Sequence, residues 1–127
     1  MSTIEIQFEN QKTVRAKLYD TQTSSALLDQ LPFSAAVNKW GDEIYCIPAF
    51  SFPLEASATN EPEVGQLGFY PDMPAFCVFY GPTPISSGPK PVAAARVNVF
   101  ASLVDIDIEL LRKVTDGSQM TVTLVKE

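Results

Sequence analysis

The ten prolines of this 127-residue chain all fall between positions 32 and 91. Proline has no backbone N–H and fixes φ, so it ends helices and is confined to the ends or edges of strands. We therefore expect the middle of the chain to hold short strands and irregular segments. The segment 81–91 (GPTPISSGPKP) carries four prolines and two glycines, which predicts a surface loop shaped by fixed φ angles.

The two ends of the chain are more regular. Residues 4–8 and 14–18 alternate between apolar and polar side chains, which is typical of strands with one wet face. We expect these strands to form a hairpin in which Glu5 and Glu9 face the basic residues Arg15 and Lys17.

Two short helices are expected beside the strands. Thr21 or Thr23 can cap the first, over residues 24–31, and Asp105 can cap the second, over residues 106–114. A side-chain oxygen at that position accepts a hydrogen bond from one of the free N–H groups of the first turn.

The remaining alternating or β-branched segments complete a mainly β fold. They predict strands at residues 35–40, 43–47, 50–54, 66–70, 75–80, 92–104 and 120–125. About eight strands with two short helices favour a closed or nearly closed β-barrel capped by the helices, because an open sheet would leave unprotected edges. The length fits a single domain over residues 1–127 with one continuous core.

The chain contains no histidine. Serine–histidine and cysteine–histidine nucleophilic machinery is therefore excluded, together with the commonest metal ligand. Cys46 and Cys77 form no CxxC pair and cannot make a four-ligand zinc site. We expect no cofactor and no metal, and we interpret both thiols as buried groups in a reducing compartment, with a lone disulfide between them as the alternative.

The net charge of −6 and the pI near 4.5 disfavour nucleic acid and anionic membranes as partners. The N-terminal segment MSTIEIQFEN lacks the basic start and apolar run of a signal peptide. No apolar stretch approaches the ~18 residues that a membrane helix needs. These features predict a cytoplasmic protein.

Three stretches, residues 31–48, 63–86 and 93–117, resemble the small prokaryotic cyclophilin-like family, whose members are minimal cyclophilin-fold β-barrels of unestablished function. The most specific matching pieces are Asn38-Lys39-Trp40-Gly41, Glu43-Ile44-Tyr45, Gly68-Phe69-Tyr70-Pro71 and Phe79-Tyr80-Gly81-Pro82. The resemblance runs over nearly the whole chain and implies a cyclophilin-like closed barrel of about eight strands with two capping helices.

True cyclophilins are peptidyl-prolyl isomerases that use an arginine beside the proline nitrogen, a glutamine, a histidine and a floor of phenylalanines. The stretch expected to carry the arginine and histidine here is 44–47 (IYCI), which holds no cation. The stretch expected to carry the glutamine is Cys77-Val78-Phe79, which keeps one aromatic ring and lacks the amide. The resemblance therefore implies the fold without the usual catalytic set.

The candidate groove residues are five aromatic residues and one arginine: Phe50, Phe69, Tyr70, Phe76, Phe79 and Arg96. The resemblance places Phe79 at the floor of the proline pocket. The alternative interpretation is that most of these rings fill the barrel. Arg96 either replaces the missing catalytic cation or faces solvent between its apolar neighbours, and Trp40 is either a binding platform or an anchor for its turn.

Two functions follow as hypotheses. The first is a non-catalytic binding protein for a proline-containing peptide or a small apolar molecule. The alternative is a weak or divergent prolyl isomerase, in which an apolar groove or Arg96 lowers the barrier to rotation of the amide. Exposed proline-rich loops and edge strands would permit a homodimer, although no feature of the sequence requires one.

Overall fold

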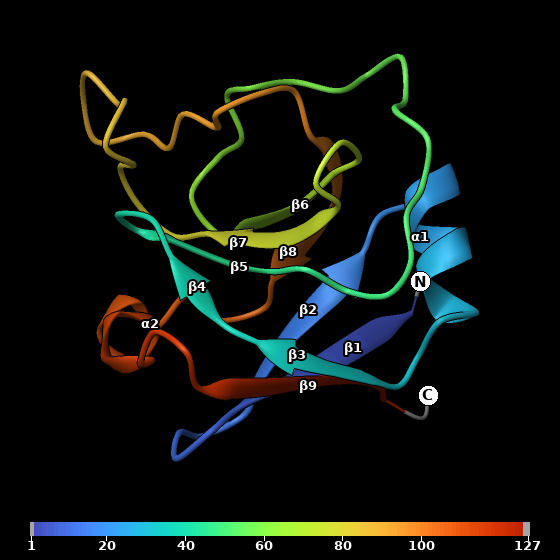
Figure 1. The fold of residues 1–127 in the computed structure, drawn as a ribbon, viewed down its shortest axis with the longest axis horizontal. Coiled ribbons are helices and arrows are strands. Elements are labelled where there is room, and N and C mark those ends of the chain that lie inside the picture. The colour runs from blue at the N-terminus through green and yellow to red at the C-terminus, as the bar shows by residue number, and fades with distance from the viewer. Residues whose placement is uncertain (1, 126–127) are drawn as a thin grey trace.

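A computed structural model describes residues 2–125 and shows nine strands and two helices. In chain order these are β1 (Thr3–Phe8), β2 (Val14–Leu18), α1 (Gln22–Leu28), β3 (Phe33–Ala36), β4 (Asn38–Lys39), β5 (Glu43–Cys46), β6 (Gln66–Tyr70), β7 (Ala75–Phe79), β8 (Asn98–Leu103), α2 (Ile108–Lys113) and β9 (Gln119–Leu124). The strand pairs between elements are antiparallel, in the order β3-β9-β1-β2-β8-β6-β7-β5-β4. Figure 1 shows how this sheet curves round on itself.

The barrel closes because its two end strands are consecutive pieces of chain. Only Val37 separates β3, which pairs with β9, from β4, which pairs with β5. The N–H of Val37 donates to the carbonyl of Ser118, and its carbonyl accepts from the N–H of Gly117, each at 2.7 Å. Segment 33–39 therefore acts as one bent strand that joins both ends of the sheet, and the predicted barrel of about eight strands with two short helices is confirmed.

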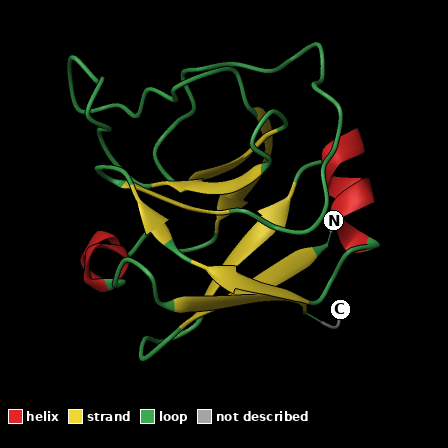
Figure 2. Cartoon of the chain, in the orientation of Figure 1, coloured by secondary structure: helices red, strands yellow, loops and turns green. Residues whose placement is uncertain are grey.

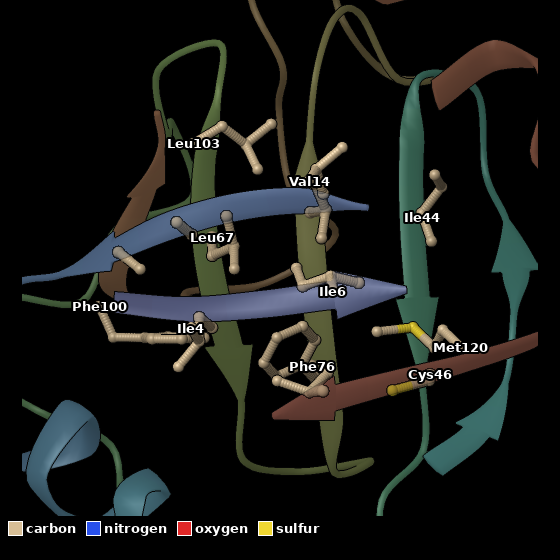
Figure 3. Packing of buried hydrophobic residues seen from close by; sticks show 14 of the residues in the cluster. Ile4, Ile6, Val14, Ile44, Cys46, Leu67, Phe76, Phe100, Leu103 and Met120 are labelled. Carbon is tan, nitrogen blue, oxygen red and sulfur yellow. The ribbon is translucent and has the colours of Figure 1, made fainter. Parts of the chain in front are cut away.

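Every second side chain of each strand points into the barrel and fills its interior, because successive side chains of a strand point to opposite faces of the sheet. Ile4, Ile6 and Phe8 of β1 are fully buried, and the polar residues between them are not. Figure 3 shows Ile4 and Ile6 among side chains from the other strands, such as Phe76 and Phe100.

The two helices lie at opposite sides of the barrel (Figure 2). Thr21 is the N-cap of α1, as one of the two predictions had it, and its hydroxyl accepts from the N–H of Ser24 at 3.1 Å. The cap predicted for α2 was wrong. Asp107 takes that role instead of Asp105, because its carboxylate accepts from the N–H of Leu110 at 3.1 Å. No helix among residues 2–125 is long and apolar enough to cross a membrane.

Two predicted strands differ from the structure. Residues 50–54 form no strand, because the Asn98 side chain ties this segment to the sheet as a loop, accepting from the Glu55 N–H at 2.8 Å and donating to the Pro53 carbonyl at 2.9 Å. The predicted strand 92–104 contributes only Asn98–Leu103. Its first part lies outside these strands, and Val97 there forms an isolated bridge with Thr59.

The opening hairpin matches its prediction in part. Glu5 lies opposite Arg15, and the two side chains form an ion pair at 3.2 Å. Lys17 instead lies opposite Thr3. Glu9 accepts a hydrogen bond from the backbone N–H of Gln119 at 2.9 Å, so the second predicted pairing is wrong.

Candidate functional site

Strand β7 is buried on both faces, which singles out the part of the barrel around it. Phe76 and Val78 point into the barrel and belong to its core. Ala75, Cys77 and Phe79 point outward and form a second, separate apolar cluster. A one-layer barrel leaves its outer face wet unless another segment covers it, so something must lie over β7.

The cover is segment 92–97, which follows the proline-rich loop 81–91 and leads into β8. Ala93 and Val97 pack against the outward side chains of β7, and the backbone N–H of Ala93 donates to the Asn60 carbonyl at 2.8 Å. In Figure 1 the long segments that precede β6 and β8 lie on the same side of the molecule, over β6 and β7. Gly68 allows the close approach, since a Cβ there would lie 2.7 Å from Val97 Cγ2.

The cover leaves a cavity of about 290 Å³ open to the outside. Its walls come from the β4–β5 turn, the outward faces of β5, β6 and β7, and the covering segment. The lining residues are Trp40, Glu43, Tyr45, Tyr70, Met73, Ala75, Cys77, Phe79, Ala93, Ala94, Ala95 and Val97. These walls are mainly apolar, as in small-molecule binding sites. The polar exceptions are the Glu43 carboxyl, the Cys77 thiol and the polar atoms of Trp40, Tyr45 and Tyr70.

Glu43 is the charged member of this lining. It opens β5 opposite Phe79 and shares the outward face of that strand with Tyr45. The residue is 7% exposed. Burial raises the pKa of its carboxyl from 4.5 to about 7, and the Cys77 thiol partly offsets this rise by donating a hydrogen bond to it. Glu43 therefore exchanges its proton near neutral pH, inside an apolar pocket.

The two cysteines lie on neighbouring strands but on opposite faces of the sheet. Cys46 lies opposite Phe76 and belongs to the barrel core, whereas Cys77 lies opposite Tyr45 and belongs to the outer cluster. Both thiols are free and buried. Burial raises the pKa of Cys46 to about 12 and that of Cys77 well above its ordinary value. Neither is therefore an activated nucleophile.

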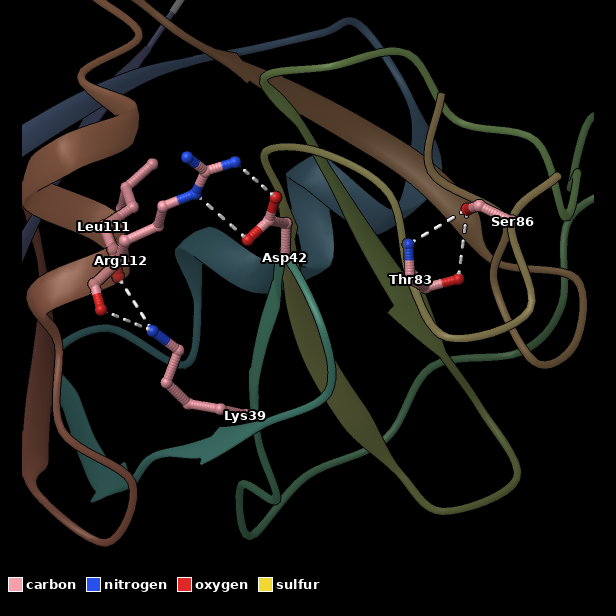
Figure 4. A network of polar contacts seen from close by, with 6 residues as sticks. All are labelled: Lys39, Asp42, Thr83, Ser86, Leu111 and Arg112. Carbon is pink, nitrogen blue, oxygen red and sulfur yellow. Dashed lines mark hydrogen bonds and ion pairs between the residues drawn. The ribbon is translucent and has the colours of Figure 1, made fainter. Parts of the chain in front are cut away.

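A polar network fixes the turn that carries Trp40 (Figure 4). Asp42 in this turn pairs with Arg112 of α2 at 2.9 Å. The Lys39 ammonium donates to the carbonyls of Leu111 and Arg112, each at 3.1 Å, and so satisfies the end of that helix. The backbone N–H of Asp42 also donates to the Pro82 carbonyl at 2.9 Å. One wall of the pocket is thereby joined both to α2 and to the loop after β7.

Gly41 in the same turn is expected to resist substitution. Its φ is +61°, and a Cβ would lie 2.9 Å from both Thr83 Cα and Pro84 Cδ. We expect Gly41→Ala to lower the free energy of unfolding by about 1–3 kcal/mol, because it combines left-handed strain with a backbone clash. Urea unfolding measures the change. Gly88→Ala is the control, since a Cβ there meets nothing within 4 Å, and equal losses in the two variants would contradict the argument.

Comparison with known proteins agrees with this geometry. A sequence-family model described as cyclophilin-like matches residues 2–123. The chain belongs to the cyclophilin-like family. The solution structure of the hypothetical protein AF2241 from Archaeoglobus fulgidus is similar, with a TM-score of 0.83 and 30% identity over 98% of this chain and 95% of that one.

A second similar structure is that of McbB in complex with tryptophan, with a TM-score of 0.70 and 19% identity. The match covers 98% of this chain but 45% of McbB, so this chain spans less than half of that protein and the likeness shows the fold. A search of curated proteins finds none that matches.

The cyclophilin-like barrel separates the residues that the sequence grouped as one groove. Phe79 and Tyr70 line the pocket. Phe69 and Phe76 are fully buried in the barrel core. Phe50 packs at the edge of that core, 5.0 Å from Phe33 between ring centroids. Three of the five rings, those of Phe50, Phe69 and Phe76, therefore lie in the barrel core or at its edge, and two line the pocket.

Arg96 lies outside the pocket. Its neighbours Ala95 and Val97 line the cavity, while Arg96 is exposed and directs its Nε toward the Ala58 carbonyl at 3.4 Å. Among the residues that line the cavity, all within the described chain, none is a lysine or arginine.

Sequence reasoning did not select Glu43 and Tyr45, which line the pocket, and left the role of Trp40 open. A signal was present, because alternation within the predicted strand 43–47 puts Glu43 and Tyr45 on the face opposite Ile44 and Cys46. That signal does not say that the face carrying Glu43 is covered. The cover comes from residues about fifty positions later in the cyclophilin-like chain.

Proposed function

We propose that this chain is a binding protein for a small, mainly apolar molecule, or for the proline ring of a peptide, in the pocket outside β7. The observation that carries the proposal is the cavity itself. A segment covers both Cys77 and Phe79 yet leaves about 290 Å³ open among aromatic side chains. That volume is close to the lower end of the ~300–1,000 Å³ range of ligand pockets, so a single flat ring system fits it best.

The structure of McbB with tryptophan supports the choice of probe. McbB, which shares this fold over 45% of its length, binds tryptophan, and the indole ring of tryptophan is neutral, flat and mainly apolar. We also propose a cytoplasmic location, which agrees with the free and buried state of Cys46 and Cys77.

The isomerase alternative receives no support from a specific contact. Its mechanism needs a cation beside the proline nitrogen, and Arg96, which was the candidate, is not among the lining residues. An isomerase here would depend on desolvation of the amide alone.

Amide NMR titrations with indole and with an Ala-Pro-Phe peptide test the proposal. We expect indole to shift the signals of Glu43, Tyr70, Cys77 and Phe79 in a saturable way, because these residues line the cavity. Ala94→Phe should weaken this binding by narrowing the entrance, since Ala94 is an exposed lining residue.

Ala56→Phe is the matched control, because Ala56 is an exposed alanine that does not line this cavity. Shifts confined to other surfaces, or equal weakening by both variants, would overturn the proposal. Binding of the peptide alone would assign the pocket to proline. Protein-dependent cis/trans exchange of that peptide would instead favour the isomerase.

A further inference from the structure

Glu43 is a buried ionisable group that the fold does not explain, and it lines the cavity. Glu55 is held by the N–H and hydroxyl of Thr23, and Asp42 is held by Arg112. Beside the carboxyl of Glu43 lies the Cys77 thiol, which lowers its pKa only in part, because a thiol is a weak donor. A carboxyl group that is 7% exposed in apolar surroundings costs free energy unless something pairs with it.

The groups that face Glu43 supply no positive charge. Its own strand presents Tyr45, and the neighbouring strands β7 and β6 present Cys77 and Tyr70. The carboxylate of the adjacent Asp42 is occupied by Arg112. The covering segment contributes alanines and Val97 to the cavity, while its Arg96 is exposed. A carboxylate at this place therefore lacks a counter-ion within the described chain.

The walls around the carboxyl suit a positively charged ligand. Trp40, Tyr45 and Tyr70 all line the same cavity, and the faces of aromatic rings attract cations, with tryptophan the strongest of the three. The net charge of −6 adds a favourable long-range field for a cation and an unfavourable one for an anion. The apolar remainder of the wall suits the uncharged body of the same molecule.

We propose that the pocket recognises a small organic amine in its protonated form, with the ammonium group at Glu43 and the apolar body against Trp40, Tyr45 and Tyr70. This inference rests on the proposed binding function and names its ligand class. The ammonium supplies the missing counter-ion, and the pair is strengthened because the Glu43 side of it is largely buried.

A ligand that accepts a hydrogen bond from neutral Glu43 would show the opposite pH dependence. Pairing with an ammonium needs the ionised carboxylate, so affinity should fall as the pH drops below about 7, where Glu43 takes up its proton. A carbonyl ligand needs the protonated acid, so its affinity should rise over the same range.

The test compares 2-phenylethylamine with 2-phenylethanol, which differ in the charged group and share the ring and chain. Trp40 is the only tryptophan of the chain and lines the cavity, so its fluorescence reports binding. At mildly alkaline pH we expect the amine to bind about tenfold more tightly than the alcohol, as for a charge-assisted hydrogen bond. Glu43→Gln should abolish this preference by lowering the affinity for the amine to that for the alcohol.

Glu63→Gln is the control, because it changes the net charge equally at an exposed carboxylate that pairs with Lys90 outside the pocket. Equal affinity for the two compounds would overturn the amine assignment and leave the binding function standing. Loss of the preference in Glu63→Gln would also overturn it, since a general field would then explain the effect. Failure of both compounds to bind would overturn it as well, and the separate indole titration would then decide whether the pocket binds small molecules.

Discussion

Glu43→Gln is expected to remove a decrease of about 3 kcal/mol in the free energy of unfolding, which the wild-type protein shows as the pH rises from about 4.5 to above 7. The carboxyl has a pKa of 4.5 in ordinary surroundings and about 7 in the folded protein. The folded state therefore holds this proton more tightly than the unfolded state. Glutamine keeps the size and shape of the side chain and cannot titrate.

The sign follows from the direction of the shift. Below about pH 4.5 the carboxyl is protonated in both the folded and the unfolded state, so no charge is buried on folding. As the pH rises toward 7, the unfolded state releases its proton first, so the stability of the wild-type protein falls. Above about 7 the full cost of a buried carboxylate is present, and it stays constant as the pH rises further.

Urea unfolding of both proteins at several values between about pH 5 and about pH 9 measures this effect. The difference in free energy of unfolding between Glu43→Gln and wild type should grow in favour of the variant with pH and level off above neutrality. Glu63→Gln, which removes an exposed carboxylate that pairs with Lys90, is the control for the change in net charge, and an equal trend in that variant would contradict the argument. Parallel stability curves for Glu43→Gln and wild type would show that the carboxyl is solvated in the folded protein.

The strands at the two ends of the chain could be predicted because each has one dry face. The alternation of Ile4, Ile6 and Phe8 with polar residues identifies both the strand and its inner face. Proline and glycine placed the turns between the middle strands for a similar local reason. These signals depend on a few adjacent residues, so one sequence is enough to read them.

The candidate site was harder to predict because its key strand carries no alternation. All five residues of β7, Ala75–Phe79, are buried, and a continuous apolar run does not say which side faces the barrel. The resemblance to cyclophilins put Phe79 at the floor of a proline pocket, and in the structure Phe79 lines the cavity, whereas Phe69 and Phe76 turn inward.

The covering segment was misread for a related reason. Apart from Arg96, residues 92–97 are apolar and adjoin β8, so they fit a long central strand. An apolar composition indicates burial but not the partner, and here the partner is the outer face of β6 and β7. Without that cover, Glu43 would be an ordinary exposed residue at the start of a strand. The burial that gives Glu43 its chemistry is thus a long-range property, which local patterns do not contain.

Phe76→Ala is expected to lower the free energy of unfolding by about 3–5 kcal/mol, as truncation of a buried phenylalanine does. Phe76 is fully buried, and its ring packs against Phe33 at 5.4 Å and Phe100 at 5.5 Å between centroids. Removing it leaves a cavity where strands from both sides of the barrel meet. Such a loss is a large part of the ~5–15 kcal/mol that stabilises a domain. Urea unfolding with a common slope for variant and wild type gives the value.

The milder pair Phe76→Leu and Phe79→Leu separates stability from binding. Both phenylalanines are fully buried and lie on one strand, but Phe76 faces the barrel and Phe79 faces the pocket. Both variants should lose stability, while only Phe79→Leu should change the affinity for indole, because only its ring lines the cavity. An equal change of affinity in the two variants would mean that the barrel core and the pocket respond as one unit. Unchanged affinity in Phe79→Leu would place the indole away from the floor of the pocket.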